Sequence, residues 1–182
     1  MRRLFLIAGL MLALGLAVVA ASAAAANFGG TWALDKTKSQ GLSQRMQGAD
    51  KVTWTITQDD KTISIDQKVE GGQPAGGGGG GGTGGGGGMG GGRPPAGPVA
   101  YKLDGSETTM EMGQGKSTLK ATWTGNVLQL SRKSTFTGPN GEVTSSETRK
   151  LDLSVDGKTL TATVHSESPR GTQDSTLVFN KQ

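Results

Sequence analysis

The chain has 182 residues, a formal net charge of +4, one histidine and no cysteine. The absence of cysteine excludes disulfides, thiolate metal sites and cysteine nucleophiles, and a single histidine excludes a histidine-rich zinc site. Lysine and arginine form no cluster, which excludes the basic footprint of a nucleic-acid-binding protein. No metal and no cofactor is therefore expected.

Residues 1–26 have the layout of a secretory signal peptide. Arg2 and Arg3 precede an apolar stretch, and a run of small residues ends before Asn27. We expect cleavage near Asn27 and export to the periplasm or the medium, with no stable membrane anchor afterwards. The alternative is a retained anchor, although the apolar stretch is at the lower limit for a spanning helix. Removing Arg2 and Arg3 lowers the net charge by two.

The segment Asn27 to Asp35, NFGGTWALD, predicts an opening β-strand. The polar connection 36–50 follows it, with Leu42 and Met46 four residues apart. This spacing predicts a single helical turn that lies over one mouth of a barrel.

The remaining signal is almost entirely alternation of apolar and polar residues, which predicts antiparallel strands with one buried face. Turn residues such as Asp156-Gly157 separate these segments. The apolar positions of the predicted strands are Val52-Trp54-Ile56, Ile63-Ile65, Val99-Tyr101-Leu103, Met110-Met112, Leu119-Ala121-Trp123, Leu128-Leu130, Leu151-Leu153, Leu160-Ala162-Val164 and Leu177-Phe179.

A glycine-rich tract at 71–97 interrupts this pattern and holds more than half of the 32 glycines. A segment without apolar side chains cannot offset the entropy lost on ordering, so we expect it to be disordered. The part before it is too short for a core of its own. The tract is therefore interpreted as an insertion in one domain that spans 27–182.

The fold predicted from these elements is all-β: a single antiparallel up-and-down β-barrel of about 8–10 strands. Closing the meander into a barrel removes the sheet edges that would otherwise aggregate. The protein is expected to be a monomer.

The pattern Phe28-x-Gly30-x-Trp32 resembles the opening of the calycin barrels, the lipocalins and the intracellular fatty-acid-binding proteins. The closing segment Thr176 to Lys181 is also similar to that of the fatty-acid-binding proteins. Gly30 to Ser39 and Leu153 to Leu160 resemble segments of exported bacterial lipocalin-like domains. The resemblance implies that Gly30 permits a tight bend and that Trp32 plugs one end of the barrel.

The sequence departs from the fatty-acid-binding family where that family holds a carboxylate. The Arg-x-Tyr clamp of the closing strand is replaced by Leu177 and Phe179. A buried carboxylate needs a cation or hydrogen-bond donors beside it. A ligand should therefore be neutral, or else held from the other wall by Arg132 or Arg149.

His165 falls on the face opposite to Leu160, Ala162 and Val164, so it is predicted to point to solvent. One outward histidine and no cysteine leave no Ser-His-Asp or Cys-His site. The protein is not expected to be an enzyme.

Three charged residues, Arg132, Glu147 and Arg149, share the inward phase of their strands. They predict a polar anchor for a ligand head group. Two alternatives remain: they pair with each other, or they lie beyond the buried part of each strand. Trp54 and Trp123 are core residues first and candidate ligand contacts second.

The leading function is non-catalytic binding of a small apolar or amphipathic molecule inside the barrel. The alternative is a barrel packed solid, which acts as a structural or protein-interaction module without a small-molecule ligand. Cavity volume separates the two, and it depends on side-chain filling that periodicity does not reveal.

Overall fold

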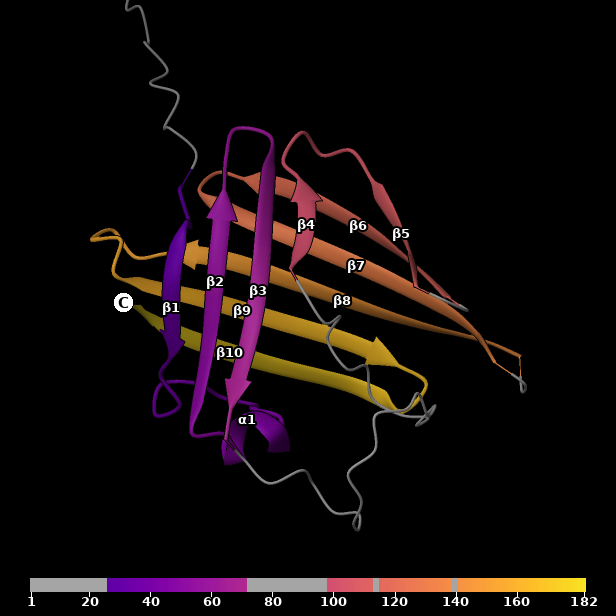
Figure 1. The fold of residues 1–182 in the computed structure, drawn as a ribbon, viewed down its shortest axis with the longest axis horizontal. Coiled ribbons are helices and arrows are strands. Elements are labelled where there is room, and N and C mark those ends of the chain that lie inside the picture. Colours follow the sequence, from indigo (N-terminus) through magenta and orange to yellow (C-terminus); the bar gives the residue numbers. More distant parts are fainter. Residues whose placement is uncertain (1–25, 72–97, 113–114, 139–140) are drawn as a thin grey trace, which may run out of the picture.

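The computed structural model describes residues 26–71, 98–112, 115–138 and 141–182. Within them lie one short helix and ten strands (Figure 1). In chain order these are β1 (Gly30–Leu34), α1 (Gln44–Gly48), β2 (Lys51–Gln58), β3 (Thr62–Glu70), β4 (Val99–Lys102), β5 (Thr108–Met112), β6 (Gly115–Thr124), β7 (Val127–Gly138), β8 (Gly141–Leu153), β9 (Thr159–Ser168) and β10 (Gly171–Lys181).

The strands form one antiparallel sheet in the order β4-β3-β2-β1-β10-β9-β8-β7-β6-β5. Consecutive strands pair, and the sheet curls because β1 also pairs with β10, where Leu34 lies opposite Phe179. Its two edges, β4 and β5, do not pair, but β4 lies close to β6. The predicted up-and-down barrel is confirmed: it has ten strands and is nearly closed.

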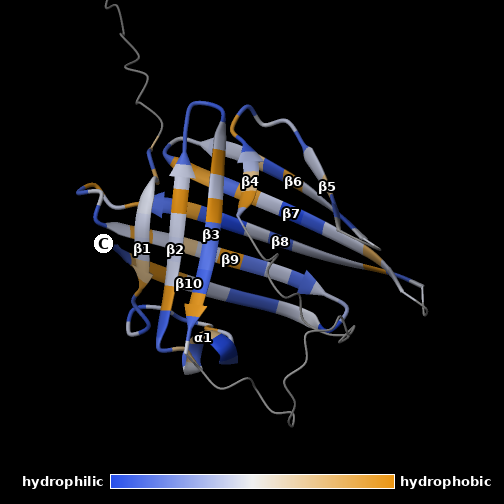
Figure 2. Ribbon diagram, in the orientation of Figure 1, coloured by the Kyte–Doolittle hydropathy of each residue, from blue (hydrophilic) through white to orange (hydrophobic). Residues whose placement is uncertain are grey.

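Two layers of strands cross in the barrel (Figure 1). Strands β1 to β4 run over β6 to β10, and the distal halves of the long strands β7 to β10 project beyond the crossing. Figure 2 shows the hydrophobic residues concentrated where the layers cross and a mostly polar distal half. At that end Phe136 of β7 and Val143 of β8 lie opposite each other and are exposed.

The predicted alternation produces the core. In β2, Val52, Trp54 and Ile56 are buried, and the threonines between them are not. Because successive side chains point to opposite faces, each strand contributes one apolar stripe to the interior. The central cluster consists of Phe28, Trp32, Trp54, Ile56, Ile63, Ile65, Tyr101, Leu119, Ala121, Leu128, Leu130, Leu151, Leu160, Ala162, Val164, Leu177 and Phe179.

Turn chemistry sets the strand register. Between β2 and β3 the Asp59 carboxylate accepts hydrogen bonds from the backbone N–H groups of Lys61 and Thr62, at 2.8 and 2.6 Å. Between β8 and β9 Gly157 adopts a φ of 67°, which a residue with a Cβ rarely does. The β8–β9 hairpin forms where Asp156-Gly157 predicted a turn.

The first connection contains the predicted helical turn, α1. Ser43 caps it by accepting a hydrogen bond from the Met46 N–H group. Leu42 and Met46 pack against the core cluster, and Gln40 forms an isolated bridge with Thr176 of β10. These contacts hold α1 over one end of the barrel, as expected.

The predicted leader, at residues 1–26, and the predicted glycine insertion, at 71–97, lie almost entirely outside the described residues. The strands that flank the insertion belong to the same sheet, because β3 pairs with β4 from Ile65 opposite Val99. In the part of the chain that the structure describes, no helix is long and apolar enough to cross a membrane.

Candidate functional site

Gly30 and Trp32 lie at the seam of the barrel. Trp32 is fully buried, and its indole N–H group donates to the Phe28 carbonyl at 2.8 Å. The Lys181 ammonium lies 5.2 Å from the Trp32 ring centroid. Gly30 has a φ of 135°, and a Cβ there would lie 3.1 Å from the Lys181 side chain. Both residues therefore lie where β1 meets β10, and their roles as a tight bend and as a plug of the barrel stay a prediction.

Trp54 of β2 is the aromatic centre of the interior. It is fully buried, its ring centroid lies 4.3 Å from that of Phe179, and its indole N–H group donates to Gln67 Oε1 at 3.0 Å. The indole is therefore fixed by a hydrogen bond on its polar edge and by an aromatic contact from β10.

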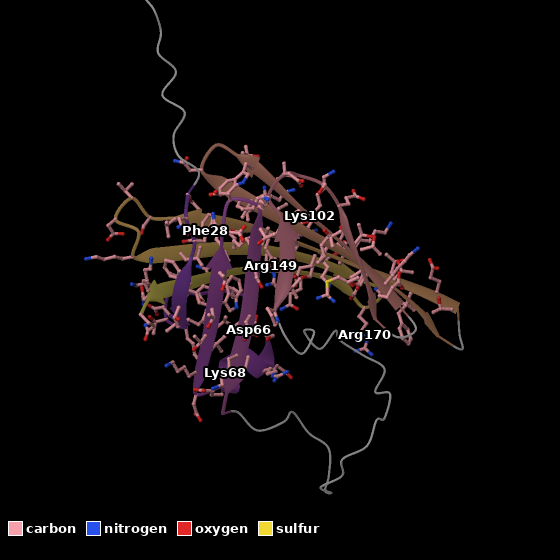
Figure 3. The ribbon with its side chains drawn as sticks, turned by 45° about the horizontal axis from the view of Figure 1, so that its top comes forward. Phe28, Asp66, Lys68, Lys102, Arg149 and Arg170 are labelled. Carbon is pink, nitrogen blue, oxygen red and sulfur yellow. The ribbon has the colours of Figure 1, made fainter. Side chains whose placement is uncertain are left out.

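Glu147 and Arg149 of β8 face the same interior and pair with each other. Arg149 Nε donates to Glu147 Oε1 at 2.8 Å, and the Arg149 guanidinium carbon lies 5.4 Å from the Trp54 ring centroid. The Arg149 side chain is 21% exposed and the Glu147 side chain is 29% exposed. Figure 3 shows Arg149 near the middle of the molecule, whereas Arg170 lies far out along the long strands.

A hollow of about 120 Å³ opens beside this pair, under α1. Its lining combines apolar side chains with hydroxyl, amide and charged groups. The lining residues are Gly41, Ser43, Met46, Trp54, Gln67, Glu147, Arg149, Val164, Ser166, Gln173, Ser175 and Leu177.

Arg132 of β7 lies beside this site without lining the hollow. It is opposite Glu147 in the sheet register, and its guanidinium donates to Ser134 at 3.2 Å and to buried Ser117 at 3.5 Å. Tyr101 of β4 lies close enough to Arg132, Glu147 and Arg149 for their charges to act on its hydroxyl group. Burial raises the pKa of the Tyr101 hydroxyl, and the Arg149 guanidinium opposes this shift.

Trp123 lies at the opposite end of the barrel from α1. It is half-buried and stacks on Phe28 with 6.0 Å between ring centroids. Of the five predicted ligand contacts, the structure brings Trp54, Glu147 and Arg149 to the hollow, sets Arg132 beside them and leaves Trp123 apart. Their role in binding stays a prediction.

His165 points to solvent, as its strand phase predicted. Its ring nitrogens lie 2.6 Å from Asp174 and 3.3 Å from Glu167, and its side chain is 48% exposed. The Asp174 carboxylate, with a smaller effect from Glu167, raises the His165 pKa. No group of three or more acidic or histidine side chains that could hold a metal ion occurs among the described residues.

The polar lining from α1, β3 and β10 was not predicted. Gln67, Ser43 and Gln173 reach the hollow from segments whose sequence carries no motif. Tyr101 was recognised only as a strand residue, although it is the sole tyrosine and has an inward phase. That combination was the available signal for a buried hydroxyl.

No protein-family model and no curated protein matches this sequence. Two solved structures are similar. One is zebrafish ileal bile acid-binding protein complexed with cholic acid, at 17% identity and a TM-score of 0.44, which covers 85% of this chain and 98% of that chain. The other is an abundant heat soluble (SAHS) protein from Ramazzottius varieornatus, at 15% identity and a TM-score of 0.46, with 85% and 94% covered.

Both likenesses are weak. The calycin-like architecture stands instead on the strand order and on the closure of β1 against β10. The chain therefore has a lipocalin- and fatty-acid-binding-protein-like fold.

Proposed function

We propose that the protein is a non-catalytic binding protein for a small amphipathic molecule, held in the hollow under α1. The observation that carries this proposal is the half-buried Glu147–Arg149 pair, which lies over Trp54 at the edge of that hollow. Charged groups inside a barrel are costly to desolvate, and a site that binds a polar group is one reason to keep them there.

The chemistry of the lining supports an amphipathic ligand. Trp54, Val164 and Leu177 offer an apolar surface, and Glu147 and Arg149 offer charged hydrogen-bonding groups beside it. The volume, about 120 Å³, is near that of an engineered apolar cavity of about 150 Å³ that binds benzene. A ligand of about one ring therefore matches the volume of the hollow.

Binding without catalysis is supported by the position of His165. The only histidine lies on the outer face, and there is no cysteine. In the part of the lining that the structure describes, Glu147 is the one carboxylate, and it is already paired with Arg149.

NMR on the isotope-labelled protein tests the proposal through its indole groups. Titration with toluene, indole and benzyl alcohol at millimolar concentration should shift the indole resonance of Trp54. The indole resonance of Trp32, whose N–H group is bonded to the Phe28 carbonyl, should stay in place. Shifts of Trp32 and Trp123 without Trp54 would place binding elsewhere.

A substitution that fills the hollow with a larger side chain tests the site, and a control variant carries the same substitution elsewhere on the strand. Ser166 lines the hollow, so Ser166→Phe should weaken binding at least about tenfold, or about 1.4 kcal/mol. Thr163→Phe places the same ring on the exposed face of the same strand, β9, and should bind like the wild type. Equal binding by both variants would exclude the hollow as the site.

The second candidate is a packed barrel that acts as a structural or interaction module. The volume of the hollow favours it, because pockets for drug-sized ligands usually measure about 300–1,000 Å³. Absence of any Trp54 shift across the apolar panel would support this candidate over the first.

We also propose that the protein is exported. The support is the sequence of residues 1–26, with two arginines, an apolar stretch and a run of alanines. Mass spectrometry of the protein from periplasm or medium should give a chain that begins near Asn27. An intact Met1 form in the membrane fraction would contradict export with cleavage.

A further inference from the structure

We infer that the hollow selects a neutral head group that both donates and accepts hydrogen bonds, of the carboxamide class, over a carboxylate of the same shape. This inference rests on the proposed function, since it names the chemical class of ligand for that site. The sequence left two alternatives open, a neutral ligand or an acid held by Arg132 or Arg149, and this inference chooses the neutral ligand.

The charge of the hollow is already balanced. Of the described residues that line it, Glu147 and Arg149 are the only charged ones, and they are joined at 2.8 Å. A ligand carboxylate that approached Arg149 would also approach Glu147, and like charges at short range repel. The arginine therefore offers an incoming anion little net attraction.

Among the described residues, no second cation lines the hollow. Arg132 shares the inward face but donates to Ser134 and Ser117 and does not line the hollow. On β10, Leu177 and Phe179 are buried and apolar. A carboxylate bound here would lose its hydration without gaining an unshared cation, which costs free energy.

Donors and acceptors that a neutral group needs are present together. Among the described residues, Glu147 bonds only through Oε1, and Arg149 donates only through Nε. The other carboxylate oxygen and the terminal guanidinium nitrogens thus have no protein partner there. A carboxamide can donate to the first and accept from the second.

Two amide side chains extend the same pattern around the hollow. Gln67 accepts from Trp54 through Oε1, which leaves its NH₂ group to donate. Gln173 donates from Nε2 to the Gly41 carbonyl at 3.3 Å, which leaves its oxygen to accept. A group with one donor and one acceptor can therefore be satisfied in more than one orientation, whereas a carboxylate can use only the donors.

Benzamide and benzoate provide the test, because they share shape and ring and differ in the head group. The wild type is titrated by NMR near neutral pH and at moderate salt. The benzamide concentration that shifts the Trp54 resonance should be at least about tenfold lower than the benzoate concentration that does so. Toluene serves as the probe without a head group. This comparison needs no variant and so does not depend on a substitution that fails to fold.

Glu147→Gln frees Arg149 from its partner and should abolish or reverse the preference for benzamide. Glu142→Gln is the matched control, because it removes the same charge from an exposed position of the same strand. It should retain the wild-type preference.

Each other outcome has a separate meaning. Benzoate bound as tightly as benzamide by the wild type would overturn the inference and leave the proposed function standing. Binding of toluene with no response to benzamide would have the same meaning. An unchanged preference for benzamide in Glu147→Gln would also overturn the inference and leave the proposed function standing. Failure of all three probes to move Trp54 would overturn the proposed function as well.

Discussion

The guanidinium group of Arg149 lies over the indole of Trp54, with 5.4 Å between the guanidinium carbon and the ring centroid. The same guanidinium donates to Glu147 at 2.8 Å, and the same indole contacts Phe179 at 4.3 Å. Residues from β8, β2 and β10 are thereby linked across the interior in one continuous set of contacts.

Arg149→Met should lower the free energy of unfolding by about 1–2 kcal/mol, because it removes a cation–π contact and leaves Glu147 half-buried without its partner. Urea denaturation measures the change. Glu147→Gln in the same background should recover part of the loss, and the coupling energy of the double-mutant cycle should be near 1 kcal/mol. Additive effects would mean that the pair contributes nothing to stability.

Phe179→Ala should cost about 3–5 kcal/mol, because it empties a fully buried position against Trp54. Val178 has the opposite phase on β10 and is half-buried, so Val178→Ala is the control and should cost less than the larger truncation. Denaturation of both variants by urea, with tryptophan fluorescence as the signal, gives the comparison. Equal losses would show that the Phe179 contact is not central to the core.

Gly41→Ala should destabilise the protein more than Gly157→Ala, although the two glycines have nearly the same φ of 66° and 67°. A Cβ at Gly157 meets nothing within 4 Å, so that variant carries only the left-handed strain of about 1–2 kcal/mol. A Cβ at Gly41 would overlap the carbonyl oxygen of Asp174 on β10, and overpacking adds about 1–3 kcal/mol. Thermal unfolding of the pair separates strain from overlap.

Acid should weaken the fold partly through Asp35. Hydrogen bonds from Thr37, Asn180 and Lys38 lower the pKa of its carboxyl from 3.8 to about 2. A depressed folded-state pKa contributes stability that is present above the unfolded value of 3.8 and is lost as the pH falls through about 2. Asp35→Asn should therefore flatten the decline in stability between these pH values, as measured by urea denaturation. An identical decline in both proteins would assign it to other carboxylates.

Replacing Gly71–Gly97 by an eight-residue Gly/Ser linker should leave the fold intact. The linker must run back along β3 from Glu70 to the level of Asp66, which is four residue steps or roughly 13 Å at about 3.3 Å per residue. Loop-closure entropy predicts a stabilisation of about 1 kcal/mol. Circular dichroism and urea denaturation check it, and unfolding of the variant would show that the tract contributes contacts.

The architecture could be predicted because the strands that cross at the core carry a period of two, as in Val52, Trp54 and Ile56. The extent of the strands could not. β10 begins at Gly171, well before the apolar pair Leu177 and Phe179, and its first four residues are exposed. Without burial there is no selection for alternation in sequence.

The candidate site was predictable as a set of inward positions and not as an arrangement. Strand phase placed Arg132, Glu147 and Arg149 on one face, and the structure agrees. It gave no means to tell that Arg149 would pair with Glu147 while Arg132 turned to Ser134. Likewise Trp54 and Trp123 share an inward phase, and only the three-dimensional structure shows that Trp54 contacts Phe179 whereas Trp123 stacks on Phe28.

The seam between β1 and β10 has a consequence for how the chain folds. Among the described strands it is the one pairing between strands that are not consecutive in sequence, and Leu34 meets Phe179 there. Closing such a loop costs about 3 kcal/mol more entropy than closing a turn of about five residues. Local hairpins can therefore form early, while the hydrophobic surface of Trp54 stays open to solvent and to other chains. Closing the seam buries this surface and so removes a site at which unfolded chains could associate.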